Sequence, residues 1–265
     1  MGWNPGQHSD DDNLRWSWLR AVEWGRWPVF LSQPIGPVLL IWLPWQQVAL
    51  LVIGANLFWA TFIRYRFVST QLAFIGVTFV GGLISMLVVF PGNEGLLAER
   101  FRSPLQKGQP LADKIVLSLF LAIFFGLLIF IPLDVFRWHL LPEPGPVASA
   151  AGLGLVAAGW TIITLALAQN PFAAPVVKRQ DERGQVVVDT GVYGVVRHPM
   201  YAGAALFLIG MPLWLESYAG ALLACLAVAT LALRIVFEER FLRRELKGYD
   251  AYTERVRYRL IPFGW

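Results

Sequence analysis

The sequence predicts an all-α, polytopic integral membrane protein: a helical bundle of about six or seven membrane segments with an interfacial helix at its N-terminus. Of the 265 residues, 56% are hydrophobic, and the mean hydropathy is +0.54. Only 15% are charged, against about 25% in soluble domains. Twelve tryptophans also favour a membrane protein, because tryptophan is enriched at membrane–water interfaces.

The apolar runs place the helices, since a helix needs about 20 apolar residues to cross the hydrocarbon core. The tail, residues 1–27, has the pattern of an interfacial amphipathic helix. Residues 28–44 should form a broken or re-entrant segment, because prolines interrupt this run. Spanning helices are expected at about 46–63, 71–90, 115–133 and 147–168. The last two segments, about 200–215 and 218–236, should form a helical hairpin.

Positive charge orients this bundle, because cytoplasmic segments carry an excess of Lys and Arg. If the 170–198 loop and the C-terminus are cytoplasmic, sixteen Lys and Arg residues lie inside and three lie in outside loops. We therefore expect the C-terminal third to face the cytoplasm, in a bacterial inner membrane. The side of the N-terminus depends on whether residues 28–44 cross the bilayer.

The few cysteine and histidine residues bear on whether the chain can form a disulfide or bind a metal ion. Cys225 is the single cysteine and lies in an apolar run, so an internal disulfide and a cysteine-rich metal site are excluded. The three histidines, His8, His139 and His198, have no metal-ligand spacing. We therefore expect no metal site and no nucleic-acid partner. We expect the protein to interact with membrane lipids.

The first polar cluster precedes the hairpin. Pro199 suits the first turn of a helix, which puts Arg197 and His198 at the helix start. Free amides and the helix dipole favour an anion there. Tyr201 can share the face of Arg197, and Gly203 allows a backbone or a ligand to approach closely. A snorkelling arginine beside a helix-starting proline is the structural alternative.

The second polar cluster ends the hairpin, at Arg234, Glu238 and Glu239. Arg234 and Glu238 are spaced to pair on one helix face, so a structural ion pair is one interpretation. Ionisable residues in spanning helices are also functional candidates. Because a hairpin returns its end to the side where it started, both clusters should converge. Such a site would combine positively and negatively charged side chains and could bind a zwitterion.

Three strings carry a family resemblance: Thr190-Gly-Val-Tyr-Gly-Val-Val-Arg-His-Pro-Met-Tyr-Ala-Gly203, Arg234-x-x-x-Glu238-Glu239, and a closing Tyr-x-x-Tyr before Arg-Leu-Ile-Pro. Together they resemble the isoprenylcysteine carboxyl methyltransferase family and its phospholipid methyltransferase relatives, over about residues 170–262. The segment that begins Asn170-Pro-Phe172 resembles a bacterial branch of this family. The N-terminal half differs, so the acceptor does not follow from the resemblance.

The resemblance implies S-adenosylmethionine as cofactor and a cofactor-binding core with a C-terminal cytoplasmic helix at 169–265. The apolar runs divide the rest of the chain into the tail (1–27) and the N-terminal membrane helices (28–168). The resemblance implies a cofactor-binding set of Tyr193, Arg197, His198, Tyr201, Gly203, Glu238 and Glu239. It also implies a catalytic pair on the acceptor side, Arg234 and Glu238.

The chemistry expected from this pattern is methyl transfer to a lipophilic acceptor, whose reacting group is a carboxylate, a thiol or a lipid head group. The protein would mainly align and desolvate the reactants. Arg234 would steady an anionic acceptor, and Glu238 would orient Arg234 or the cofactor, or act as base toward an amine.

Two other functions compete with this interpretation. Membrane sterol reductases, which use NADPH, share a Tyr-rich closing stretch and an Ile-Pro ending; the intact Arg-His-Pro-x-Tyr-x-Gly string disfavours them. The other alternative is a scaffold or transporter. Transporters usually carry ionisable groups near the bilayer midplane, whereas the charges here gather at one interface.

Overall fold

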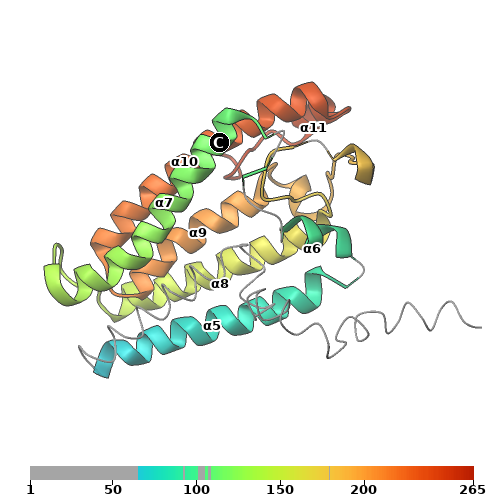
Figure 1. Cartoon of the computed structure of the whole chain (residues 1–265). Helices are drawn as coiled ribbons and strands as arrows, with labels where there is room; N and C mark the ends of the chain where they lie inside the picture. The colour runs from blue at the N-terminus through green and yellow to red at the C-terminus, as the bar shows by residue number, and fades with distance from the viewer. Residues whose placement is uncertain (1–64, 92, 101–104, 107–108, 179) are drawn as a thin grey trace, which may run out of the picture. The chain divides into compact units, whose positions relative to one another are not determined.

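The computed structural model describes residues 65–91, 93–100, 105–106, 109–178 and 180–265 (Figure 1). The expected interfacial tail (1–27), broken segment (28–44) and helix 46–63 lie outside these residues. Within the described ranges every regular element is helical. The main helices are α5 (Tyr65–Val89), α6 (Glu94–Arg100), α7 (Leu111–Leu133), α8 (Pro146–Gln169), α9 (Pro199–Trp214), α10 (Tyr218–Glu245) and α11 (Tyr249–Arg255).

Three of the described helices are long and apolar enough to cross a membrane: α8, α10, and α7 together with the turn η3 (Asp134–Trp138) that continues it. This confirms the predicted all-α membrane fold. The last helix runs on to Glu245, although its apolar part suggested an end near 236. The length of an apolar run predicts only the part of a helix that lies in the lipid. Glu and Arg are good helix formers, so the helix continues beyond the apolar run.

The helices α8 and α9 pack most closely, with their backbones in contact. A Cβ atom placed on Gly159 of α8 would lie 2.5 Å from the carbonyl oxygen of Gly203 on α9. A Cβ on Gly152 would lie 2.5 Å from the amide nitrogen of Trp214, near the other end of α9. Glycine on both helices is therefore what allows this close contact.

The predicted hairpin is formed by α9 and α10, which pack together, and α10 also packs against α7 (Figure 1). Ser217 caps α10 by accepting a hydrogen bond from the Gly220 amide at 2.8 Å. Its hydroxyl lies 2.6 Å from Oδ2 of the buried Asp134, just after α7. The hairpin turn is thereby attached to α7 at the end opposite the polar clusters.

The core lies between α7, α9 and α10, where Ile131, Met211 and Ile235 are fully buried. Large apolar side chains also point outward; Ile115 on α7 and Leu222 on α10 are 59% and 65% exposed. Outward-facing aliphatic side chains on a charge-poor helix suit a surrounding of lipid. Core and exterior are therefore both apolar, as a membrane bundle requires.

The helix α11 folds back against the end of α10 and the loop before α9. Gly248 separates the two helices and has φ 87°, a left-handed conformation that glycine adopts without strain. Tyr249, Tyr252 and Val256 form a small buried cluster there, packed against partly buried residues that include Leu246. This cluster places α11 beside the polar residues of the hairpin.

Candidate active site

Backbone hydrogen bonds attach the C-terminal segment, residues 256–265 after α11, to the start of α9. His198 is the N-cap residue of α9, and Pro199 occupies its first turn, as predicted. The amide of Arg197 donates to the carbonyl of Tyr258, and the amide of His198 donates to that of Arg259, both at 2.9 Å. These two amides are therefore not free for an anion, in contrast to the expectation. At these two residues a ligand can be recognised only by the side chains.

Glu239 of α10 joins the two polar clusters. Its Oε1 accepts a hydrogen bond from Nε of Arg197 at 2.6 Å and lies 3.3 Å from Nε2 of His198. Nε of Arg259 donates to Oε2 at 2.9 Å. Arg197 also donates to the carbonyl of Val256 at 2.8 Å. The buried carboxylate is thus fully paired, and it holds the start of α9, the end of α10 and the C-terminal segment together.

Tyr201 of α9 and Glu238 of α10 form a second link between the clusters. The Tyr201 hydroxyl donates to Oε2 of Glu238 at 2.6 Å. The guanidinium of Arg234, one turn earlier on α10, lies 5.9 Å from the centre of the Tyr201 ring. The predicted convergence across the hairpin is therefore present, and Tyr201 is in contact with both residues of the Arg-x-x-x-Glu pair.

Arg234 forms its ion pair with Asp113 of α7, not with Glu238. Its Nε lies 2.9 Å from Oδ1 of Asp113, and its Nη2 donates to the carbonyl of Pro175 at 2.6 Å. Within the described residues no salt bridge joins Arg234 to Glu238, so the ion pair that their spacing allowed is not formed. The physical reason is that Asp113, only 1% exposed, presents a buried carboxylate to α10, whereas Glu238 turns toward Tyr201.

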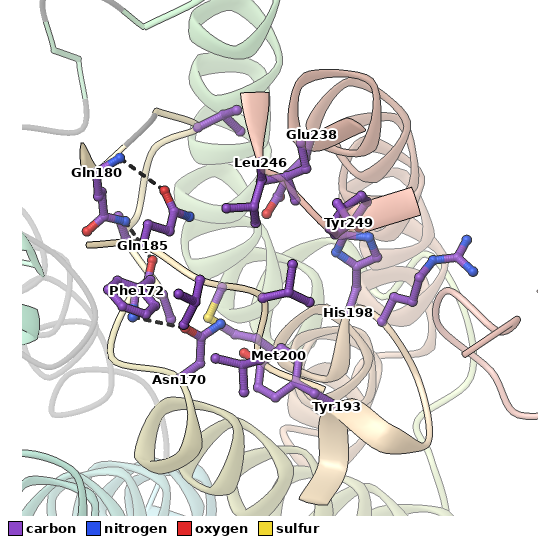
Figure 2. A pocket seen from close by; sticks show the side chains of 18 of the residues that line it. Asn170, Phe172, Gln180, Gln185, Tyr193, His198, Met200, Glu238, Leu246 and Tyr249 are labelled. Carbon is purple, nitrogen blue, oxygen red and sulfur yellow. Dashed lines mark hydrogen bonds between the residues drawn. The ribbon is translucent and has the colours of Figure 1, made fainter. Parts of the chain in front are cut away.

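A cavity of about 100 Å³ lies beside these residues and opens to solvent. Figure 2 shows the side chains that line it. Its polar lining is formed by Asn170, Lys178, Gln180, Gln185, Tyr193, Arg197, His198, Tyr201, Glu238, Tyr249 and Tyr252. Its apolar lining includes Phe172, Val176, Val177, Val186, Val187, Met200, Leu242 and Leu246. The mixture of a few polar groups with apolar walls is typical of small-molecule sites.

Five of the predicted site residues line this cavity: Tyr193, Arg197, His198, Tyr201 and Glu238. Three do not. Glu239 and Arg234 lie behind the lining, paired as described above. Gly203 lies in the α8–α9 interface, where an added Cβ would meet the carbonyl oxygen of Gly159 at 2.6 Å. Of the two predicted reasons for this glycine, the structure supports close backbone approach.

Sequence reasoning missed several contributors that come from outside the two clusters. Asp113 was detectable as an ionisable residue in the first turn of a spanning helix. Arg100 of α6 is buried and donates to the carbonyl of Ala173, a cavity residue, at 2.9 Å. Burial lowers the pKa of Arg100 to about 10, which leaves it charged at neutral pH. Asn170 and Lys178 reach the cavity from the loop before α9, where no periodic pattern marked them.

The tyrosines around the cavity remain protonated hydrogen-bond donors at neutral pH. Burial raises the pKa of Tyr193 to about 12, and it raises the pKa of Tyr249 and of Tyr252 further. The Tyr252 hydroxyl donates to the carbonyl of Tyr193 at 2.8 Å. In the part of the chain that the structure describes, no cluster of His, Cys, Asp and Glu side chains could hold a metal ion.

Fold and site together define a helical membrane protein with a polar cavity at one end of the bundle. The phospholipid methyltransferase family model matches residues 147–247, which span α8, the loop after it, α9 and α10. This part of the chain is therefore similar to the phospholipid methyltransferase family, in agreement with the resemblance that the motifs predicted. A search of curated proteins finds no match for the chain.

Proposed function

We propose that the protein is an S-adenosylmethionine-dependent methyltransferase that methylates a lipophilic acceptor at the cytoplasmic face of the membrane. One observation supports the proposal: His198, Tyr201 and Glu238 lie within the residues that the family model matches, and they line one cavity. The cavity lies where charged side chains from both ends of the hairpin meet, so it can receive a ligand that carries both signs of charge.

The residues present fit S-adenosylmethionine. This cofactor would supply a methyl group on a positively charged sulfur. The carboxylate of Glu238 lines the cavity and favours a cation. Aromatic side chains of Tyr193 and Tyr201 border the same space, where a flat ring or a sulfonium can pack. The hydroxyl of Tyr249, also in the lining, is buried and has no hydrogen-bond partner among the described residues, as expected for a group that serves a ligand.

The lining also suits an acceptor with an apolar part. Val176, Val186 and Leu246 line the same cavity as Glu238, so a lipophilic group could lie against them while its polar end meets the charged side. An acceptor that arrives as a carboxylate or thiolate needs no base. An amine would have to lose a proton, which Glu238 is placed to accept.

Arg234 fits a positioning role better than direct contact with the acceptor. It lies behind the lining, held by Asp113 and by the carbonyl of Pro175. From there it supports the ring of Tyr201, and Tyr201 in turn holds the carboxylate of Glu238. We therefore propose that Glu238 faces the ligands and that Arg234 maintains its position.

The orientation follows from the excess of Lys and Arg in the loop before α9 and in the C-terminal segment. The cofactor would then enter from the cytoplasm and the acceptor sideways from the bilayer. A reporter enzyme fused after Trp265 should be active in the cytoplasm. Activity only on the opposite side would contradict the orientation and the entry route.

The function is tested with the purified full-length protein in detergent. Calorimetry should detect binding of S-adenosylhomocysteine and no binding of NADPH, and His198→Ala should weaken the former. Labelled S-adenosylmethionine incubated with lipid extracts should then transfer its label to a lipid-soluble product. Binding of NADPH without S-adenosylhomocysteine would support the reductase alternative and overturn the proposal.

A further inference from the structure

Tyr249, at the start of α11, is the best indication of how the cavity holds its ligand. It follows directly after Gly248, whose left-handed φ of 87° turns the chain back from α10. The side chain lines the cavity and is 4% exposed. In Figure 2 it lies on the same side of the cavity as His198 and Glu238. The residue lies just beyond the matched domain, which ends at 247.

The hydroxyl of Tyr249 is buried, and across the described ranges it has no hydrogen-bond partner. Leaving such a group unpaired is unfavourable, and native structures rarely do so without a reason. Tyr252, one turn later on the same helix, shows the ordinary situation: its buried hydroxyl donates to the carbonyl of Tyr193 at 2.8 Å. Of these two buried tyrosines in α11, only Tyr252 has a hydrogen-bond partner for its hydroxyl among the described residues.

The surroundings of the hydroxyl indicate what kind of atom it would meet. The pKa of Tyr249 is raised mainly by burial and, to a lesser extent, by the nearby carboxylates of Glu239 and Glu238. The guanidinium of Arg197 lowers this pKa, but its effect is smaller. The group therefore stays protonated and can donate. A negatively charged ligand atom would be repelled by the same carboxylates. A neutral oxygen or nitrogen suits the position better.

We propose that the Tyr249 hydroxyl binds the uncharged nucleoside half of the cofactor, so that α11 forms part of the binding site. The inference rests on the proposed function, because it takes an adenosyl compound as the ligand. It assigns the sugar hydroxyls or the base of that compound to the α11 side of the cavity. The charged amino-acid half then lies elsewhere in the cavity.

Tyr249→Phe removes this hydroxyl and little else. We expect the ligand-free variant to melt at or above the wild-type temperature, because an unpaired buried hydroxyl is lost. Tyr252→Phe should melt lower, because it loses a hydrogen bond that the ligand-free protein contains. A fall in melting temperature for Tyr249→Phe equal to that for Tyr252→Phe would overturn the proposal, since the hydroxyl would then have a protein partner.

Calorimetry on the same full-length preparations supplies the binding test. Tyr249→Phe should weaken both S-adenosylhomocysteine and methylthioadenosine, which lacks the amino-acid half, by a similar factor of about 3 to 10. Tyr218→Phe, at the far end of α10, is the matched control and should bind both compounds as the wild type does. Unchanged binding by Tyr249→Phe, or a loss confined to S-adenosylhomocysteine, would overturn the assignment. Absence of binding by the wild type would instead overturn the proposed function.

Discussion

The guanidinium of Arg234 lies 2.9 Å from the carboxylate of Asp113, across 121 positions of the sequence. Gln109 and the amide of Val177 also donate to this carboxylate, at 2.7 and 3.1 Å. Asp113 belongs to α7, outside the residues that the family model matches. A membrane helix from the N-terminal part of the chain therefore supports the candidate site through a buried ion pair.

Breaking this ion pair should destabilise the protein. Asp113→Ala leaves the Arg234 guanidinium buried without its partner, a change that typically costs about 3–5 kcal/mol. The free energy of unfolding in detergent measures the effect. Asp250→Ala is the control: it breaks the exposed Arg243–Asp250 pair, whose side chains are 43% and 67% exposed, and should cost at most about 1 kcal/mol. Equal losses for the two variants would contradict a structural role for Asp113.

Glu239→Ala should loosen the C-terminal segment. The substitution leaves Arg197 without its buried carboxylate and releases Arg259, which joins the segment to α10. We expect a lower free energy of unfolding, by about 3–5 kcal/mol, and weaker binding of S-adenosylhomocysteine, because Arg197 and His198 would no longer be held. Limited proteolysis should cut the C-terminal segment sooner than in the wild type. A variant with wild-type stability and affinity would show that this network is dispensable.

Gly203→Ala tests whether this residue serves packing or ligand binding. The new methyl group would lie 2.6 Å from the carbonyl oxygen of Gly159, and backbone on both helices would have to move. A loss of about 1–3 kcal/mol in stability is expected, while affinity for S-adenosylhomocysteine per folded molecule should remain. Gly154→Ala on α8, where a Cβ meets nothing within 4 Å, should not be destabilising. Lost affinity with retained stability would return Gly203 to the binding residues.

Alkaline pH should destabilise the protein through its buried tyrosines. Burial raises the pKa of Tyr193 from 10.0 to about 12. Between these values the folded state holds the proton more firmly than the unfolded state, so stability is full below about pH 10 and falls as pH approaches about 12. Melting temperatures measured across this range should fall less steeply for Tyr193→Phe. Identical pH profiles would indicate that Tyr193 is exposed to solvent.

The sequence by itself determined the membrane class, the approximate positions of the five long apolar helices after residue 65 and the convergence of the two polar clusters. These follow from local rules. A charge-poor run of sufficient length forms a spanning helix, and a hairpin returns its end to the side where it began. The starts of α9 and α10 also depend on local signals, namely Pro199 in the first turn of α9 and Ser217 as the N-cap of α10.

The tertiary structure alone decided which partner each charged residue takes. Spacing on one helix made Glu238 the expected partner of Arg234, but the crossing of α7 and α10 brought Asp113 closer. The position of Gly203 against α8 and the return of the C-terminal segment onto Arg197 depend in the same way on how helices pack. Such contacts join residues that are far apart in the chain, and a buried charge takes the partner that packing brings to it, which periodicity within one helix cannot reveal.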